Sequence, residues 1–239
     1  MIKIQNLSKA FGTKLAVKDL TVDFNDGEVV GLLGPNGAGK STTIKMITGI
    51  LTPTKGDVLI DGHSITHDAL LAKQSIGFVP DSPDMFLGMT GADYLAFIAT
   101  VFHMDKDQAK AKSLALSKEF NLDDVLNDLI INYSHGMRQK IFVIGSLLHD
   151  PHNWILDEPL TGLDPEAAFQ VKAKMKDMAH NGCSVLFSTH VLDVAEKVCD
   201  KVAIINHGEL IFLGTLEELR AKENIGGGDL EDLFLNLTR

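Results

Sequence analysis

The chain has 239 residues, 45% of them hydrophobic and 23% charged, and its formal net charge is −10. This size and composition are typical of one globular domain with room for a substantial insertion. The acidic charge argues against nucleic acid as a partner, because a nucleic-acid groove usually needs a basic stripe. No apolar run approaches the roughly 18 residues of a membrane span.

The first sixty residues favour β-strands. Apolar residues alternate through 2–7 and through 20–24, and the second run ends on an Asn25-Asp26-Gly27 turn. The segment 57–65 is typical of a hairpin with Asp61-Gly62 at its tip. We therefore expect an antiparallel β-subdomain at this end of the chain.

The middle of the chain, from Thr90 to about Leu148, has a helical pattern. Thr90 and Asp93 form a start that resembles a capping box, and Met137, Ile141 and Ile144 recur at helical spacing. After residue 153 the chain alternates strands and helices, and this alternation predicts an α/β fold with a mostly parallel sheet. The helical stretch is then an insertion in that fold. A glycine run at 226–228 leads to a last predicted helix over 229–237.

A phosphate-binding pattern, G-x-x-x-x-G-K-[ST], stands between the strand predicted at 28–33 and a helix carrying Ile44, Ile47 and Ile50. Small residues let the backbone wrap a polyphosphate, and the helix N-terminus adds N–H donors. The lysine is expected to reach the β- and γ-phosphates and the serine hydroxyl to bind Mg²⁺. The predicted nucleotide-binding residues of this segment are Gly34, Pro35, Asn36, Gly37, Ala38, Gly39, Lys40, Ser41 and Thr42.

Two other patterns are weaker. Residues 54–57, TKGD, resemble a guanine-reading motif, but they follow the phosphate loop too soon, and a turn explains them better. His149 and His152 form an H-x-x-H with no acidic third ligand nearby, so we expect a loop and not a metal site. Cys183 and Cys199 have no metal-ligand spacing, and no signal peptide is recognised, so we expect reduced thiols in a cytoplasmic protein.

Two acidic residues follow the apolar strand WIL at 154–156. Asp157 is suited to hold Mg²⁺ through water, and Glu158 to polarise an attacking water. The next strand ends in STH at 188–190, which places His190 where it could sense a γ-phosphate. The candidate catalytic residues are therefore Glu158, His190 and Lys40.

Taken together, these motifs resemble the ATP-binding-cassette (ABC) ATPases over nearly the whole chain. They occur in the family's order: the phosphate loop, GFVPD at 77–81, YSHGMRQ at 133–139, WILDEP, LTGLDP and STH. The resemblance implies a P-loop NTPase with an antiparallel β-subdomain, a mostly parallel core sheet and an inserted helical subdomain. On this basis 1–89 and 151–225 form the ATP-binding core, 90–150 the insertion and 226–239 a tail. It also implies ATP and Mg²⁺ as ligands.

In this family two cassettes enclose two ATP molecules, and each site combines the phosphate loop of one chain with the signature of the other. Residues 133–137 (YSHGM) stand where the usual L-S-G-G-Q signature would be. The resemblance implies that Ser134 and Gly136 contact the partner's γ-phosphate, with His135 at a glycine position and Met137 at the glutamine position. Ser134 is also a good helix cap. The alternative, a hydrolase nucleophile beside its base, is disfavoured because adjacent residues rarely face each other.

Three further positions carry roles that the resemblance implies. Phe11 would stack on adenine, although a core position on a β-face is the alternative. Asp164, in LTGLDP, would touch the opposite site and can also cap the helix that starts at Pro165. Asp81 replaces the family's usual glutamine; a carboxylate can approach Mg²⁺ or water but cannot donate an N–H. The role of Asp81 in coupling therefore stays open.

The resemblance implies an ATPase subunit of an ABC transporter, cytoplasmic and peripheral on the inner face of the cell membrane. A separate multi-span permease would supply the pathway and contact the helical insertion and the loop 81–89. The second ATPase would be a copy of this chain, although a related heterodimer is possible. Asp81, the SHGM variant and the short C-terminal segment resemble the bacterial exporter branch.

Two alternatives come from other classes. One is a soluble ABC-type ATPase, for example in metal-cluster assembly, which the size of the chain does not exclude. The other is a small-molecule P-loop kinase, which would not need the signature at 133–137 or the histidine at the strand end.

Overall fold

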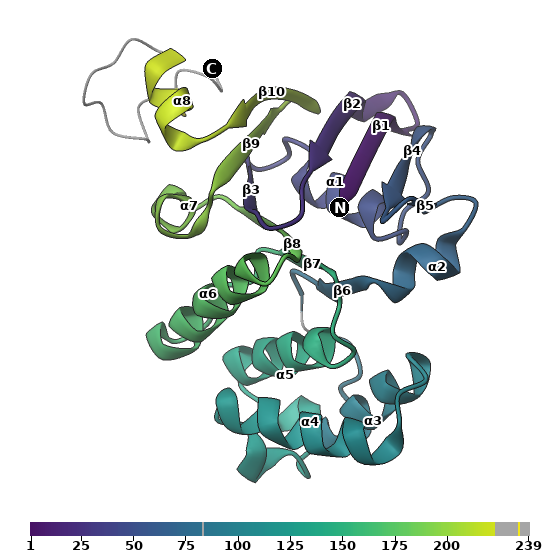
Figure 1. Cartoon of the computed structure of the whole chain (residues 1–239), viewed down its shortest axis with the longest axis vertical. Coiled ribbons are helices and arrows are strands. Elements are labelled where there is room, and N and C mark those ends of the chain that lie inside the picture. The colour runs from purple at the N-terminus through teal and green to yellow at the C-terminus, as the bar shows by residue number, and fades with distance from the viewer. Residues whose placement is uncertain (83, 223–233, 235–239) are drawn as a thin grey trace.

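The computed structural model describes residues 1–82, 84–222 and 234. They form an antiparallel sheet of order β2-β1-β4-β5 and a larger sheet of order β10-β9-β3-β8-β7-β6, with helices around both (Figure 1). The predicted α/β class with an antiparallel β-subdomain and a mostly parallel core sheet is confirmed.

The antiparallel sheet comprises β1 (Ile2–Phe11), β2 (Lys14–Phe24), β4 (Lys55–Ile60) and β5 (His63–Ser64). Alternate residues of β1, among them Ile2 and Ile4, are fully buried, which is the period-two pattern of the sequence. The predicted hairpin is present, because Ile60 pairs with His63 across Asp61-Gly62. The TKGD segment is not the predicted turn, because Lys55, Gly56 and Asp57 already belong to β4 and only Thr54 precedes the strand.

The core sheet comprises β3 (Val29–Leu33), β6 (Ile76–Val79), β7 (Asn153–Asp157), β8 (Ser184–Thr189), β9 (Lys201–Asn206) and the antiparallel edge strand β10 (Glu209–Gly214). Strands β3, β7 and β8 are buried at every residue, since helices or the second sheet cover both faces. The carboxyl ends of the parallel strands meet at one edge of the sheet. Segments far apart in the sequence therefore come together there.

Helix α1 (Lys40–Ile47) follows β3 and ends earlier than its apolar spacing predicts. Gly49, at a φ of +65°, turns the chain away, and Ile50 lies beyond the helix with 60% of its surface exposed. The prediction that Ile50 belongs to this helix is therefore wrong. From β4 the chain runs through β5 and helix α2 (Ala69–Gln74) to β6 in the core sheet.

The helices of the middle segment gather at the end of the molecule away from the antiparallel sheet (Figure 1). They are α3 (Gly91–Val101), α4 (Lys106–Glu119), two 3₁₀ turns (Asp123–Val125 and Ile130–Asn132) and α5 (His135–Leu147). Thr90 caps α3 and accepts from the Asp93 N–H at 3.0 Å, as predicted. Helix α5 lies beside β6 and buries Ile141, Phe142 and Ile144.

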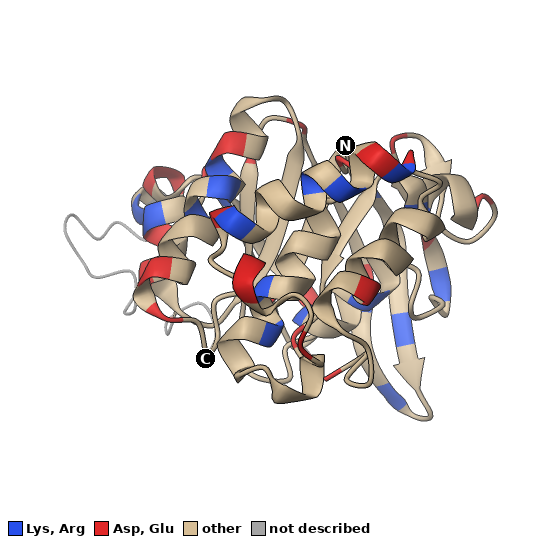
Figure 2. Cartoon of the chain, turned by 90° about the horizontal axis from the view of Figure 1, so that it is seen from below, with Lys and Arg blue, Asp and Glu red and all other residues tan. Residues whose placement is uncertain are grey.

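The remaining helices are α6 (Pro165–His180), α7 (Leu192–Val198) and α8 (Leu216–Lys222). Figure 2 shows acidic and basic residues interspersed along the helices seen from below. Over the described ranges, no helix combines the length and apolar character needed to cross a bilayer. The predicted tail helix at 229–237 lies outside the described residues apart from position 234, and the predicted domain boundaries stay a prediction.

Candidate functional site

The phosphate-loop segment joins β3 to α1, and its glycines fit the backbone closely. A Cβ added to Gly34 would collide with the carbonyl oxygen of Ile205. Gly39 has a φ of +114°, and a Cβ there would lie 2.8 Å from the Ala16 carbonyl oxygen. Only glycine fits these two positions, because both the space and the backbone conformation exclude a side chain.

Lys40 is the charged group inside this loop. Its side chain is 7% exposed, and its ammonium donates to the carbonyl oxygens of Gly34 at 2.6 Å and of Pro35 at 3.3 Å. Burial lowers the pKa of Lys40, while the carboxylates of Glu158 and Asp157 act in the opposite direction. The ammonium is thus held in a turn of backbone that also offers the N–H groups of a helix start, an arrangement suited to phosphate.

Asp157 lies below the loop, at the carboxyl end of β7, and is 1% exposed. Its Oδ1 accepts from the hydroxyls of Ser41 at 3.1 Å and Ser188 at 2.6 Å. Burial raises the pKa of Asp157; the two hydroxyls oppose that rise, and the charges of Asp81 and Glu158 add to it. The Ser41 hydroxyl and the Asp157 carboxylate meet here, and the Asp81 carboxylate lines the cavity beside them. Oxygen groups of this kind are the hard ligands that Mg²⁺ prefers. The residues therefore fit the predicted Mg²⁺ site.

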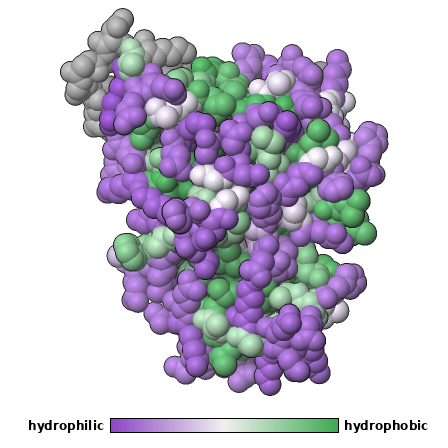
Figure 3. All heavy atoms as spheres, viewed as in Figure 1, coloured by the Kyte–Doolittle hydropathy of each residue, from purple (hydrophilic) through white to green (hydrophobic). Residues whose placement is uncertain are grey.

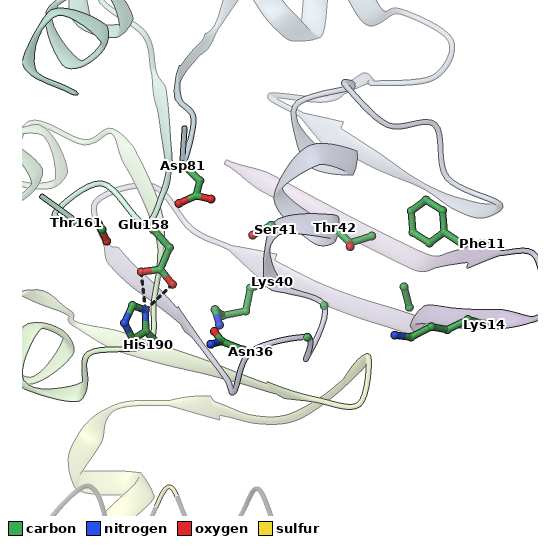
Figure 4. A pocket seen from close by; sticks show the side chains of 13 residues that line it. Phe11, Lys14, Asn36, Lys40, Ser41, Thr42, Asp81, Glu158, Thr161 and His190 are labelled. Carbon is green, nitrogen blue, oxygen red and sulfur yellow. Dashed lines mark hydrogen bonds and ion pairs between the residues drawn. The ribbon is translucent and has the colours of Figure 1, made fainter. Parts of the chain in front are cut away.

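Glu158 and His190 form a pair at the mouth of the site. The Nδ1 of His190 lies 3.0 Å from both carboxylate oxygens of Glu158 (Figure 4). Glu158 has a φ of +49°, which is unusual for a residue other than glycine, and its N–H donates to the Ser188 hydroxyl at 2.9 Å. A carboxylate oriented by a histidine can orient and polarise water.

A cavity of 480 Å³ runs along the phosphate loop and reaches the Glu158–His190 pair. Figure 4 shows the ring of Phe11 at one end of it and the Glu158–His190 pair at the other, with Lys40 and Ser41 between them. Phe11 is 51% exposed, so the alternative of a buried core position is wrong. The sequence-predicted residues that line the cavity are Phe11, Asn36, Gly37, Gly39, Lys40, Ser41, Thr42, Asp81, Glu158 and His190.

Some predicted residues support this cavity without lining it, and some lining residues were not predicted. Gly34, Pro35, Ala38 and Asp157 belong to the loop and to the strand end behind it. Not predicted were Ser188, which binds Asp157, and the lining residues Lys14, Ala16 and Thr161. Ser188 stands in the STH motif, which is a sequence signal, but its role as a partner of Asp157 becomes visible only in the β7–β8 register.

The signature residues Ser134, His135, Gly136 and Met137 do not line the cavity, and neither does Asp164. The Ser134 hydroxyl caps α5 by accepting from the Met137 N–H at 3.2 Å. Asp164 caps α6 by accepting from the Ala167 N–H at 2.8 Å, as predicted. The His135 ring lies against Gly162, so the hydrolase interpretation of Ser134-His135 has no nucleophile–base hydrogen bond among the described contacts.

The two histidines of the H-x-x-H have separate partners. The Nε2 of His149 lies 3.0 Å from the Ile76 carbonyl oxygen, and its ring stacks on Phe102. Burial lowers the pKa of His149 to about 4. The Nδ1 of His152 instead lies 3.1 Å from both Asp61 carboxylate oxygens. Both histidines lie in a loop, as predicted, and each ring has separate contacts. The expectation that no acidic residue lies nearby is wrong for His152, because Asp61 and Asp26 are beside it.

The glycine loop, the buried lysine and the strand-end carboxylates in this fold define a P-loop nucleotide-binding protein. The model of the ABC transporter family matches residues 17–161, which is more than half of the chain. The SkfA peptide export ATP-binding protein SkfE of Bacillus subtilis is 36% identical over 211 residues, which cover 88% of this chain and 87% of that protein. The chain therefore belongs to the ABC transporter ATP-binding family, as its motifs predicted.

Solved structures agree with this assignment. An ATP-binding subunit of an ABC transporter matches with a TM-score of 0.94 and 30% identity, and the match covers 100% of both chains. A cassette described as a dimeric post-hydrolysis state with ADP and phosphate shares the fold, with a TM-score of 0.82 at 23% identity over 90% of this chain and 99% of that one. The chain is accordingly an ABC-type ATPase.

Proposed function

We propose that this chain hydrolyses ATP as one half of a pair and thereby drives transport, in the direction of export, through a separate membrane-spanning partner. One observation carries the proposal. The cavity gathers the phosphate loop, Lys40 and Glu158, but it leaves Ser134 and Gly136 outside. A single chain therefore presents a phosphate site at one place and a capped helix start, suited to anions, at another. A second copy can bring the two together.

In this proposal Phe11 stacks on the adenine, and the loop and Lys40 hold the phosphates. Ser41, Asp157 and Asp81 are the residues that would hold Mg²⁺, directly or through water. When bound, Mg²⁺ would neutralise charge that develops on the phosphates. Glu158 orients the attacking water and His190 fixes the carboxylate, while Ser134 and Gly136 of the second copy contact the γ-phosphate.

The membrane partner is proposed to be a multi-span permease that holds the ATPase pair against the inner face of the cell membrane. Figure 3 shows apolar residues at the surface of both the inserted helical segment and the part that contains the two sheets. Phe86 and Phe97 are partly exposed, and their rings meet at a tilt of 45° with centroids 5.6 Å apart, where Phe86 lies against the inserted helix α3. The likeness to a peptide-export protein supports export as the direction.

The test of shared sites is complementation. Ser134→Arg chains lack a usable signature, and Lys40→Ala chains lack a usable phosphate loop, so each homodimer should be inactive. A mixed dimer has one doubly damaged site and one intact site. We expect ATP turnover to recover on mixing to about half that of the unmodified dimer per dimer, provided that the two sites work independently. No recovery in verified heterodimers would overturn the proposal.

The soluble-ATPase alternative is tested separately by the Glu158→Gln chain. This chain should retain ATP, lose about 10²–10⁴-fold in turnover and accumulate as an ATP-bound dimer. Purified from membranes with its natural partners, the trapped dimer should carry a multi-span protein. Recovery of the trapped dimer with only soluble proteins would favour the alternative.

A further inference from the structure

The first turn of α5 packs closely on the loop that follows Glu158 in the same chain. A Cβ added to Gly162 would collide with the His135 ring and lie 2.8 Å from its Nε2. A Cβ added to Gly136 would lie 3.2 Å from the Gly162 carbonyl oxygen. Gly162 also has a φ of +75°. The approach of the α5 start to this loop therefore requires a residue at 162 that has no side chain and tolerates a left-handed backbone.

Two contacts one turn further along α5 hold the same loop, residues 159–164, at both ends. The Gln139 side chain, 1% exposed, donates through Nε2 to the Pro159 carbonyl oxygen at 3.4 Å. The Lys140 ammonium pairs with an Asp164 carboxylate oxygen at 3.6 Å. Helix α5 thus contacts the beginning, the middle and the end of the loop.

The loop is in turn fixed to Glu158. The Thr161 N–H donates to the Glu158 carbonyl oxygen at 3.2 Å. The left-handed backbone of Glu158, with a φ of +49°, is strained and persists only where its surroundings hold it. The Glu158 N–H is fixed by its hydrogen bond to the Ser188 hydroxyl. The Glu158 carbonyl oxygen is fixed by Thr161, whose loop packs against α5.

We propose that His135 is a positioning residue, which acts through Gly162 to keep the Glu158 of its own chain in place. This inference rests on the proposed function, and it adds a link between the two sites of the pair. The helix start that contacts the partner's nucleotide also sets the catalytic carboxylate beside the chain's own nucleotide. A glycine at residue 135, as in the family's usual signature, has no side chain to cover Gly162.

The test needs a dimer with one working site. Chains with different C-terminal affinity tags are co-expressed, one of them carrying Glu158→Gln, and the mixed dimer is isolated by two successive affinity steps. Hydrolysis then occurs beside the intact Glu158, with the signature supplied by the chain that carries Glu158→Gln. His135→Gly is placed on either chain, and kcat and KM for ATP are measured.

With His135→Gly on the chain that has the intact Glu158, we expect kcat to fall about tenfold and KM to stay within about twofold, since a small misplacement of a catalytic group has effects of this order or larger. On the other chain, we expect kcat to change by less than about twofold. An unchanged kcat in the first arrangement would overturn the proposal. So would an equal or larger fall in the second, because His135 would then act on the partner's nucleotide.

His135→Phe is the matched control, because a flat apolar ring can still cover Gly162 but has no imidazole chemistry. On the chain with the intact Glu158, it should retain kcat within about threefold, with a pH profile that matches the unmodified dimer. A loss as large as that of His135→Gly would mean that the imidazole itself acts, and the packing role would be wrong.

A further control separates this inference from the proposed function. Ser134→Arg on the chain that carries Glu158→Gln must silence the working site, because that chain supplies its signature. If activity survives, the sites are not shared and the proposed function fails, whatever His135 does. If activity is lost and the His135 arrangements do not differ, only the positioning role fails.

Discussion

The two functional regions of this molecule differ in how far one chain completes them. In the phosphate-loop region the charged groups are enclosed: Lys40 and Asp157 are almost fully inside the protein and already have hydrogen-bond partners. The signature region is a helix start in which Ser134 and His135 are exposed, and the Ser134 hydroxyl satisfies one backbone N–H. The first region is pre-organised before any ligand arrives. The second is organised to meet something outside its own chain.

The largest loss of ATP turnover should come from removing the buried positive charge of the phosphate loop. Lys40→Ala removes the cation from the loop, and we expect ATP turnover to fall by at least about 10²–10³-fold, with weaker ATP binding. Turnover and the binding of a fluorescent ATP analogue are the measurements. Lys45→Ala is the control, since Lys45 is an exposed lysine on the same helix. Equal losses from both variants would place the phosphate site elsewhere.

A substitution of Asp157 tests whether the buried carboxylate, which is needed for function, lowers the free energy of unfolding of the nucleotide-free chain. Burial raises the pKa of Asp157 above its ordinary value of 3.8, so the ionised form is less favourable in the folded chain than in the unfolded one. Asp157→Asn keeps an oxygen for both serine hydroxyls and removes this penalty. We expect the nucleotide-free variant to gain stability relative to the unmodified chain as pH rises above about 4, and to lose turnover because Mg²⁺ is held poorly.

Urea unfolding without nucleotide, at a series of pH values, measures this difference. Below the ordinary pKa both chains are neutral at residue 157, so the gap should close there. Asp23→Asn, at a site where the side chain is 52% exposed, should change stability by no more than about 0.5 kcal/mol. A loss of stability in Asp157→Asn at neutral pH would show that the carboxylate is stabilising in the absence of nucleotide.

The exposed region can be tested with two helix caps of the same geometry. Ser134 caps α5 at 3.2 Å and Thr90 caps α3 at 3.0 Å. Either residue changed to alanine should lower the free energy of unfolding by about 1 kcal/mol. Only Ser134→Ala should also lower ATP turnover, by about tenfold, because only that hydroxyl is proposed to meet a partner's γ-phosphate. Equal turnover in both variants would mean that Ser134 only caps α5 and does not contact a partner's nucleotide.

The sequence predicts the buried region better than the exposed one, for physical reasons. The glycine loop and its lysine are consecutive, and alternating or continuous apolar runs mark the strands that carry them. Ser188 escaped because its role depends on the pairing of β7 with β8, which brings it opposite Asp157. Lys14 and Ala16 reach the cavity only because the β1–β2 hairpin folds over the loop. In the signature region the local cap was predictable, but the contact of His135 with Gly162 depends on tertiary packing.

The smallest effect is expected at Phe11, where the buried region opens to solvent. Because the ring is already 51% exposed, Phe11→Ala should change the free energy of unfolding by no more than about 0.5 kcal/mol. The loss of stacking on adenine should raise KM for ATP about threefold to tenfold with little change in kcat, since an aromatic contact of this kind is worth roughly 0.5–1.5 kcal/mol. Leu15→Ala, an exposed apolar residue on the same hairpin, is the control. The sharpest readout compares ATP with inorganic triphosphate, which has no base: Phe11→Ala should weaken binding of ATP alone, and equal weakening of both would mean that Phe11 supports the loop instead of the adenine.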